Sequence, residues 1–183
     1  SGSSYAGVWG DFDNDGLLDL VGPDFGGVVC LYRNEGYGSF VPISSTGLTV
    51  GEGTGVAWSD YDGDGFLDLF LANHMESNRL FRNDSGTGAF TQVTLGNIVT
   101  DIGHSLATSW ADYDNDGAPD LIVFNHDFEN FLYHNHRDGS FERVSAGSLG
   151  IEVVDAHGGA WGDFDNNGFT DLFAANAAGN NLL

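Results

Sequence analysis

Basic residues are scarce in this 183-residue sequence, since 5 Lys and Arg stand against 27 Asp and Glu and leave a formal net charge of −22. A chain with this charge repels nucleic acid and anionic membrane surfaces, so we expect neither as a partner. It attracts cations instead. Metal binding is therefore the first chemistry that the composition suggests.

Cysteine, proline and long apolar segments are also scarce. The single Cys30 excludes an internal disulfide. No apolar run approaches the ~20 residues that a transmembrane helix needs, so we expect no membrane insertion. Only 3 Pro occur, whereas 28 Gly recur at matching places and indicate turns. With 41% hydrophobic residues, the chain can bury a core as one compact domain or one repeat array.

A twelve-residue acidic motif occurs four times. It reads WGDFDNDGLLDL from Trp9, WSDYDGDGFLDL from Trp58, WADYDNDGAPDL from Trp110 and WGDFDNNGFTDL from Trp161. The motif thus recurs every 49 to 52 residues. A period of this length is typical of propellers and solenoids.

Counted from its first Asp, each motif has Asp at positions 1, 3 and 9 and Gly at position 6, and position 5 is Asp in the first three motifs and Asn167 in the fourth. This spacing lets a short loop surround Ca²⁺, with the carbonyl of position 7 as a further ligand. The expected ligands are Asp11, Asp13, Asp15, Leu17 and Asp19; Asp60, Asp62, Asp64, Phe66 and Asp68; Asp112, Asp114, Asp116, Ala118 and Asp120; and Asp163, Asp165, Asn167, Phe169 and Asp171. Asn167 lowers the charge of the fourth loop, so we expect the fourth Ca²⁺ site to be the weakest. Folding should depend on Ca²⁺, because the clustered carboxylates otherwise repel one another.

Two other interpretations of the motif are less consistent with the sequence. An EF-hand requires Glu at position 12 and helices on both sides, whereas position 12 is here Gly22, Leu71, Val123 or Ala174 and the flanks resemble strands. A polar surface turn without metal explains one copy, but four copies in one register favour a repeated metal loop.

Each unit contains four short segments with strand character, separated by turn residues. In the second unit they are GVAWSDY, LDLFLAN, NRLFRN and AFTQV. This order predicts an all-β fold, a β-propeller of four-stranded antiparallel blades, with three complete units and a truncated fourth. We expect a single array over residues 1–183, with blades at about 5–44, 54–94, 105–145 and, in part, 157–183. The chain is then either a piece of a longer propeller or receives the missing strand from another chain.

The motif WxDxDxDGxxDL, followed by N…NxLxRNxGxGxF, resembles the FG-GAP/VCBS type of repeat. Such repeats occur in integrin alpha-subunit propellers, fungal propeller lectins and many secreted bacterial proteins. The resemblance covers essentially the whole chain. It implies calcium-binding blades in a ring of about seven, so that four units form part of a ring.

The up-and-down order places the calcium loops at one end of each blade and the links between blades at the other end. We expect a partner to bind at the other end, where the loops differ between units. The candidate ligand-binding residues there are Glu52, His74, Glu76, His104, His126, Asp127, Asp155 and His157. Solvated loop histidines are the simpler interpretation of this set, and a transition-metal site of His and Asp is the alternative.

Other residues suggest further roles. No Ser/His/Asp or Cys/His arrangement has motif support, so we expect no enzymatic activity. The four Trp recur in strand register and should pack within the blades. Asn83-Asp84-Ser85 fits the N-glycosylation pattern in a predicted hairpin, so Asn83 is a candidate glycan acceptor in a secreting host.

The sequence therefore predicts a secreted or cell-surface, calcium-stabilised propeller for binding or adhesion, with a protein or a glycan, as in lectins, as ligand. The chain begins at Ser1, so we expect a mature or truncated product whose targeting segment is not visible. One alternative is a structural subunit that self-assembles head to tail into a fibre or ring through its incomplete fourth blade. Another is a non-catalytic module of a secreted hydrolase or lyase.

Overall fold

The computed structural model describes residues 7–24, 28–44, 46–49, 51, 53–145, 153–177 and 179–182. Its regular structure is almost entirely β, with one short helix, α1 (Asn97–Thr100), among the described residues. The all-β prediction is confirmed. Within these ranges no helix is both long and apolar enough to cross a membrane.

The first two units each form four antiparallel strands in sequence order. The first contains β1 (Val8–Gly10), β2 (Asp19–Asp24), β3 (Val28–Asn34) and β4 (Phe40–Ile43). The second contains β5 (Gly53–Ser59), β6 (Asp68–Ser77), β7 (Arg79–Asn83) and β8 (Phe90–Gln92). An acidic loop joins the first strand to the second in both units.

The third unit repeats this plan and the fourth begins it. The third contains β9 (Ile102–Ala111), β10 (Asp120–Asn125), β12 (Phe131–Asn135) and β13 (Phe141–Val144). The fourth contains β15 (Ala156–Gly162) and β16 (Asp171–Asn176), with an isolated bridge between Ala174 and Leu182. A short ladder joins β11 (Phe128–Glu129) to β14 (Val153–Val154). The predicted three propeller blades with a partial fourth are therefore confirmed.

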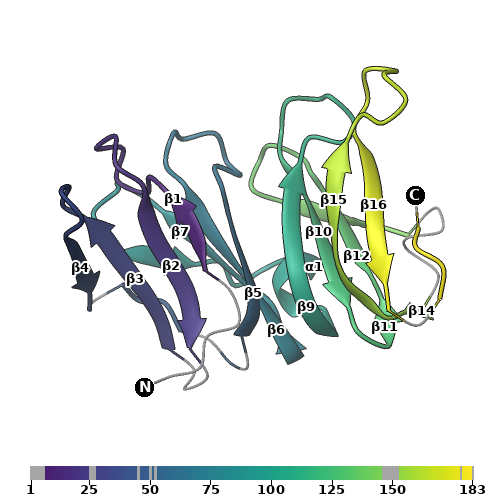
Figure 1. The fold of residues 1–183 in the computed structure, drawn as a ribbon, viewed down its shortest axis with the longest axis horizontal. Helices are drawn as coiled ribbons and strands as arrows, with labels where there is room; N and C mark the ends of the chain where they lie inside the picture. The colour runs from purple at the N-terminus through teal and green to yellow at the C-terminus, as the bar shows by residue number, and fades with distance from the viewer. Residues whose placement is uncertain are drawn as a thin grey trace.

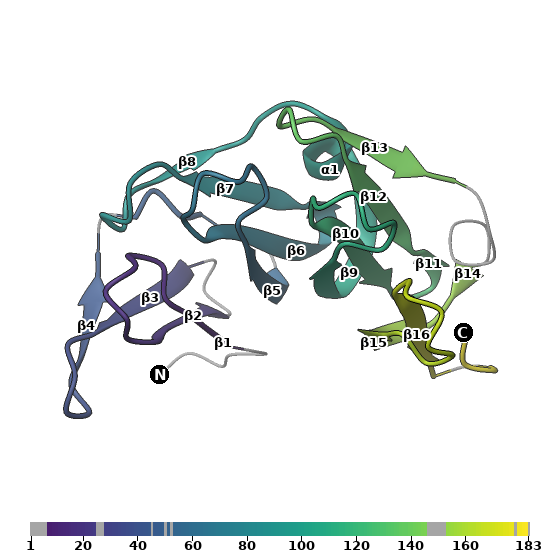
Figure 2. The same cartoon turned by 90° about the horizontal axis from the view of Figure 1, so that it is seen from above.

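The four units lie side by side in an arc (Figure 2). Its inner edge is formed by the first strands β1, β5, β9 and β15, and its outer edge by β4, β8 and β13. In Figure 1 the four acidic loops, residues 11–19, 60–68, 112–120 and 163–171, gather at the upper end, which we call the acidic end. Residues 74–78, 101–105, 126–130 and 155–157 form the opposite end.

The blades are not fully separate sheets. Strand β6 continues past the second unit and pairs with β9, so that His74 faces His104 and Ser77 faces Ile102. The second and third units thereby share one sheet. The sequence analysis did not anticipate this pairing, which depends on a contact between neighbouring repeats.

The hydrophobic core lies between the units rather than within one of them. The second strands of the two middle units are covered on both faces, since every residue of β10 is buried and so are the first six residues of β6. Their near-continuous apolar sequence suits this position, because a strand covered on both faces has no side that needs polar residues. Each buried Leu, Ile or Phe contributes about 1.5–3 kcal/mol. Packing between neighbouring units is therefore a main source of stability.

The aromatic residue at loop position 2 shows how one unit covers the previous one. Phe12 and Tyr61 are 1% and 5% exposed, because they pack against Phe90 and Phe141 of the following unit. The equivalent Phe164 is 63% exposed, and no unit packs on it among the described residues. An apolar face is thus left open at the fourth unit.

Three of the four repeated tryptophans pack against the hydrophobic clusters between units. The rings of Trp58 and Trp110 lie 6.1 Å and 6.2 Å from those of Phe90 and Phe70. Trp161 packs against the small cluster between the third and fourth units. Trp9 is 55% exposed, because within the described ranges no unit covers this side of the first unit.

Candidate functional site

The four acidic loops share one conformation, which main-chain hydrogen bonds to carboxylates define. In the first loop, Asp11 accepts hydrogen bonds from the backbone N–H groups of Asp15 and Gly16 at 3.1 Å and 2.9 Å. The equivalent bonds occur at Asp60, Asp112 and Asp163. Gly16 has φ = 88°, a left-handed conformation that favours glycine. The repeated motif therefore forms the same tight loop four times.

The carboxylate at position 9 fixes each loop to the sheet. Asp68 accepts hydrogen bonds from the backbone N–H groups of Tyr61 and Asn83 at 3.1 Å and 2.8 Å. Asp19 and Asp120 do the same in their units, and all three are fully buried. Asp171 is only half-buried and accepts a bond from the N–H of Phe164 at 3.1 Å. The fourth loop is thus the least enclosed.

Burial and mutual repulsion make several of these carboxylates hard to ionise in the absence of a cation. Burial is the largest cause that raises the pKa of Asp68 to about 7, and neighbouring Asp62 and Asp64 add to it. Burial likewise raises the pKa of Asp13, Asp19, Asp62 and Asp120. A bound cation would reverse this effect, since it stabilises the charged form.

The donor set of the loops suits a hard cation. Carboxylate oxygens of Asp60, Asp62 and Asp68 lie within 4.8 Å of one another, as do those of the equivalent residues in the third loop. Oδ1 of Asp13 is buried, and among the described residues no hydrogen-bond donor reaches it. A buried oxygen without a partner is costly, and a cation within the loop would satisfy it. An all-oxygen set of this kind is what Ca²⁺ prefers.

The structure adds a histidine to the third loop that the sequence analysis missed. Nδ1 of His134 lies 3.2 Å from Oδ1 of Asp120 and 3.4 Å from Oδ2 of Asp114. In the other units its position is occupied by Arg33 and Arg82. The signal in the sequence is a basic residue directly before the Asn that ends each third strand.

That Asn joins neighbouring units. Nδ2 of Asn83 donates hydrogen bonds to the carbonyls of Phe12 and Leu67 at 2.8 Å and 3.2 Å. Asn135 makes the equivalent bonds to Tyr61 and Pro119 at 2.8 Å and 3.1 Å. Asn83 is fully buried and both of its amide hydrogens are used. The structure therefore contradicts the predicted N-glycosylation of Asn83, because a glycan has no room on this side chain.

Adjacent acidic loops are also linked through position 4. Nδ2 of Asn14 donates to the carbonyl of Gly65 at 2.8 Å, and Nδ2 of Asn115 donates to that of Gly168 at 2.7 Å. The first loop is thus joined to the second, and the third to the fourth. Gly63 occupies this position in the second loop, where it has no side chain for such a bond.

The opposite end brings together several of the candidate ligand-binding residues. The rings of His74 and His104 lie 5.1 Å apart, and that of His104 lies 6.0 Å from Phe128. Glu76 is an exposed ion-pair partner of Arg79 at 3.8 Å. The candidate Glu52 lies outside the described residues.

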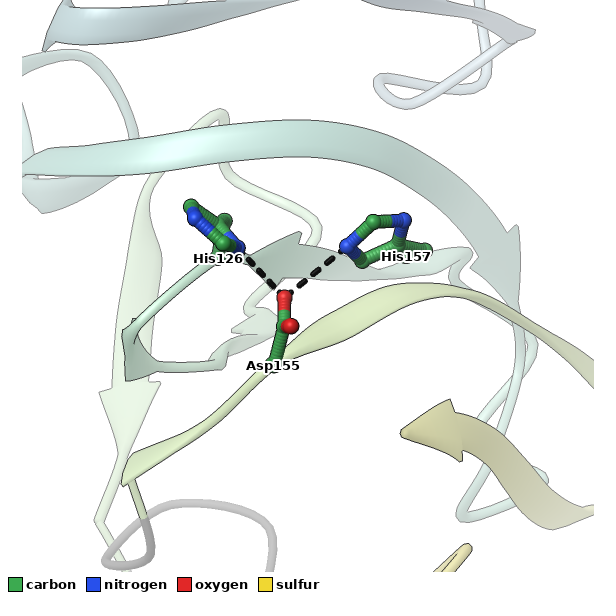
Figure 3. Close-up of side chains that lie close together, drawn as sticks. All are labelled: His126, Asp155 and His157. Atoms are coloured by element: carbon green, nitrogen blue, oxygen red, sulfur yellow. Dashed lines mark hydrogen bonds and ion pairs between the residues drawn. The ribbon is translucent and has the colours of Figure 1, made fainter. Parts of the chain in front are cut away.

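A second group forms where the third unit meets the fourth. Nδ1 of His126 and Nε2 of His157 both face Oδ1 of Asp155 (Figure 3). The distance from Nε2 of His157 to this oxygen is 2.9 Å. The hydrogen bond with His126 is the main cause that lowers the pKa of Asp155, and it raises the pKa of His126. Asp127 lies on the far side of His126, 3.3 Å from Nε2.

Comparison with known protein families agrees with this geometry. A model of FG-GAP-like repeats matches residues 11–71, 60–123 and 112–174. The chain belongs to the FG-GAP-like repeat family. Each match begins at the first Asp of one acidic loop and ends at position 12 of the next, so each matched segment contains the acidic motif twice. The resemblance inferred from the sequence is confirmed.

The FG-GAP-like array also resembles a solved lectin structure. That structure was described as the basis of specific recognition of non-reducing terminal N-acetylglucosamine by an Agrocybe aegerita lectin. The two chains are 19% identical with a TM-score of 0.63, and the match covers 94% of this chain and 47% of the lectin. The chain thus spans about half the length of that protein, and the likeness shows a shared fold. None of the curated proteins compared with the chain matches it.

Proposed function

We propose that this FG-GAP-like array is a non-catalytic, extracellular binding module, in which Ca²⁺ in the four acidic loops stabilises the units and the opposite end binds a neutral glycan. The observation that carries the calcium part is the buried Oδ1 of Asp13, which lacks a donor within the described part of the chain. Millimolar extracellular Ca²⁺ would keep even weak loops filled, which supports an extracellular setting.

The acidic loops would use Ca²⁺ for stability rather than for chemistry. In each loop the side-chain oxygens of positions 1, 3, 5 and 9 would surround the ion, with the carbonyl of position 7; all four side chains are carboxylates except Asn167 in the fourth loop. Asp68 at position 9 begins the second strand and accepts hydrogen bonds from Tyr61 in the loop and Asn83 in the third strand, so the ion would connect the loop to the sheet. It would also remove the repulsion among the carboxylates that burial makes severe.

The glycan part rests on the mixture of groups at the opposite end. His74 and His104 offer ring nitrogens that can bond to hydroxyl groups, and Phe128 beside them offers an exposed aromatic surface. The charge of −22 disfavours acidic sugars and therefore favours a neutral glycan. Recognition of N-acetylglucosamine by a lectin of the same fold supports this choice.

A glycan array probed with the calcium-loaded protein tests the proposal. We expect binding to neutral glycans that His104→Ala weakens by about tenfold or more. His136→Ala is the matched control, because His136 lies in the hairpin at the acidic end. If the folded, calcium-loaded protein binds no neutral glycan, the glycan part is wrong. Binding of a protein ligand that His104→Ala abolishes would instead support the protein alternative.

Self-assembly is a second candidate, which the open ends of the arc favour. Phe164, Phe169 and Phe173 are exposed on the fourth unit, and Trp9 and Phe40 on the first. The chain covers 47% of the lectin, so two copies together approach the length of that chain. Sedimentation at rising concentration tests this candidate. A monomer at all concentrations, with the same result for Phe164→Ser, would reject it.

A further inference from the structure

The contact between the third and fourth units differs chemically from the contact between the second and third. At the opposite end, the second and third units contribute His74, Met75, His104 and Leu106. At the next contact the corresponding residues are His126, Asp127, Asp155 and His157. The correspondence is counted from Asn73 and Trp110 at the first contact and from Asn125 and Trp161 at the second. Of these two contacts, only the one between the third and fourth units thus has two carboxylates, Asp127 and Asp155, and a histidine at the position of Leu106.

Three of these side chains point at a common centre. The ligand atoms of His126, Asp155 and His157 lie within 4.8 Å of one another. The two imidazole rings are 5.8 Å apart and nearly perpendicular, at 79°, and they approach the carboxylate from different sides (Figure 3). Asp155 comes from the link between the units, so the group spans both of them.

The backbone around this group is held from several directions. The ladder between Phe128 and Val154 lies directly after Asp127 and directly before Asp155. The N–H of His126 donates to the carbonyl of His104 at 2.9 Å, and the N–H of Ala177 donates to that of Asp155 at 2.8 Å. His157 occupies a β-bulge between Ala156 and Gly158. Bulges redirect side chains, and here the bulge turns His157 toward the centre.

Asp127 supplies a further feature of metal sites. His126 directs Nδ1 to the centre and Nε2 to the carboxylate of Asp127 at 3.3 Å. A histidine that binds a metal usually donates its other ring N–H to a carboxylate, which fixes the tautomer and the ring orientation. Asp127 holds this place with φ = 49°, in the left-handed region. Met75, its counterpart at the preceding contact, cannot serve this role.

We propose that His126, Asp155 and His157 bind one divalent transition-metal ion, with Zn²⁺ as the representative, and that Asp127 orients His126. Two imidazole nitrogens and one carboxylate form a donor set that suits Zn²⁺ and differs from the all-oxygen set of the acidic loops. The ion would replace the hydrogen bonds to Asp155. Three protein ligands leave a coordination position open for water or for a donor atom of a ligand.

Such an ion would strengthen the contact that needs it most. Of the three hydrophobic clusters among the described residues, the one between the third and fourth units is the smallest. An ion held by His126 from the third unit, by Asp155 from the link and by His157 from the fourth unit would connect the two units directly. The ion would raise the stability of the folded array, because it binds the folded state and not the unfolded chain.

Calorimetric titration of Zn²⁺ into the protein in millimolar Ca²⁺ tests the proposal, because Ca²⁺ occupies the acidic loops during the measurement. We expect one Zn²⁺ per chain and a higher Tm with Zn²⁺. His157→Leu, which introduces the residue found at the preceding contact, should weaken Zn²⁺ binding by about tenfold or more. Asp155→Asn should do the same, whereas His74→Leu should leave it unchanged. Circular dichroism without Zn²⁺ confirms that each variant is folded.

Co²⁺ provides a spectroscopic readout of the same site. The wild type should give visible absorption bands of Co²⁺ bound to imidazole and carboxylate, and His157→Leu should lose them. The proposal is wrong if Zn²⁺ does not bind in millimolar Ca²⁺, or if His157→Leu and Asp155→Asn bind it as tightly as the wild type. Glycan binding is measured separately and without Zn²⁺, so failure of this site leaves the proposed function untouched.

Discussion

The two ends of the array differ in how strictly they repeat. At the acidic end, the same hydrogen bonds recur in every loop: two backbone N–H groups donate to Asp11 in the first loop, and two donate to Asp163 in the fourth. At the opposite end, equivalent positions carry different chemistry, such as His104 in one unit and Asp155 in the next. The repeated end is therefore best explained by a structural requirement common to all units. The varied end is where a specific partner can be distinguished.

The burial of the position-9 carboxylates offers the strongest test within the acidic end. Asp68→Ala should destabilise the protein by roughly 3–5 kcal/mol, because two buried backbone N–H groups lose a charged acceptor. Asp171→Ala, in the half-buried fourth loop, should cost about 1–2 kcal/mol. Urea unfolding in millimolar Ca²⁺ measures both. Equal losses would contradict the ranking of the fourth loop as the weakest.

The asparagine that joins neighbouring units should matter more where it reaches a second unit. Asn83→Ala removes bonds to Phe12 and Leu67, and should cost about 2–3 kcal/mol. Asn34→Ala is the matched control, because Asn34 donates to Leu18 of its own unit, and should cost about 1 kcal/mol. Chemical denaturation measures the difference. A smaller loss at Asn83 than at Asn34 would show that the link between units is unimportant.

Stability without calcium should fall as the pH rises. Burial raises the pKa of Asp68 in the fold to about 7, above the ordinary value of 3.8, so the fold binds a proton that the unfolded chain releases. This contribution is fully present below pH ~4 and is lost as the pH rises through ~7. Thermal unfolding of calcium-free protein between pH 5 and pH 8 measures it. Asp68→Asn should reduce the fall of Tm with pH. A Tm that rises with pH in the calcium-free wild type would show that burial does not raise the pKa of Asp68 in this way.

The missing link between the second and third loops allows a change that should stabilise the array. Gly63 has φ = 74° and open space where a side chain would begin, and asparagine tolerates this conformation. Gly63→Asn should add up to about 1 kcal/mol if its amide reaches the third loop as Asn14 reaches the second. Gly63→Ala, which has the backbone strain without the amide, should lower the Tm. If both variants behave alike, the amide link has no value.

Much of this architecture was predictable because the motif repeats and its strands follow short-range patterns. The loops, the strand order and the burial of β6 and β10 depend on local spacing and apolar runs. The pairing of β6 with β9 and the inward position of Asn83 depend on contacts between units. The Asn-Asp-Ser pattern at Asn83 is local and carries no information on burial, which is why the glycosylation prediction was wrong.

We expect above all that the acidic loops bind Ca²⁺ and that the fold depends on it. The most direct test is thermal unfolding of the calcium-free protein during titration with Ca²⁺, with ion stoichiometry from calorimetry and Mg²⁺ as the control. We expect four bound Ca²⁺, one of them weaker than the rest, and a Tm that rises steeply as the loops fill. A Tm that Ca²⁺ does not change, or the absence of binding at millimolar Ca²⁺, would contradict it.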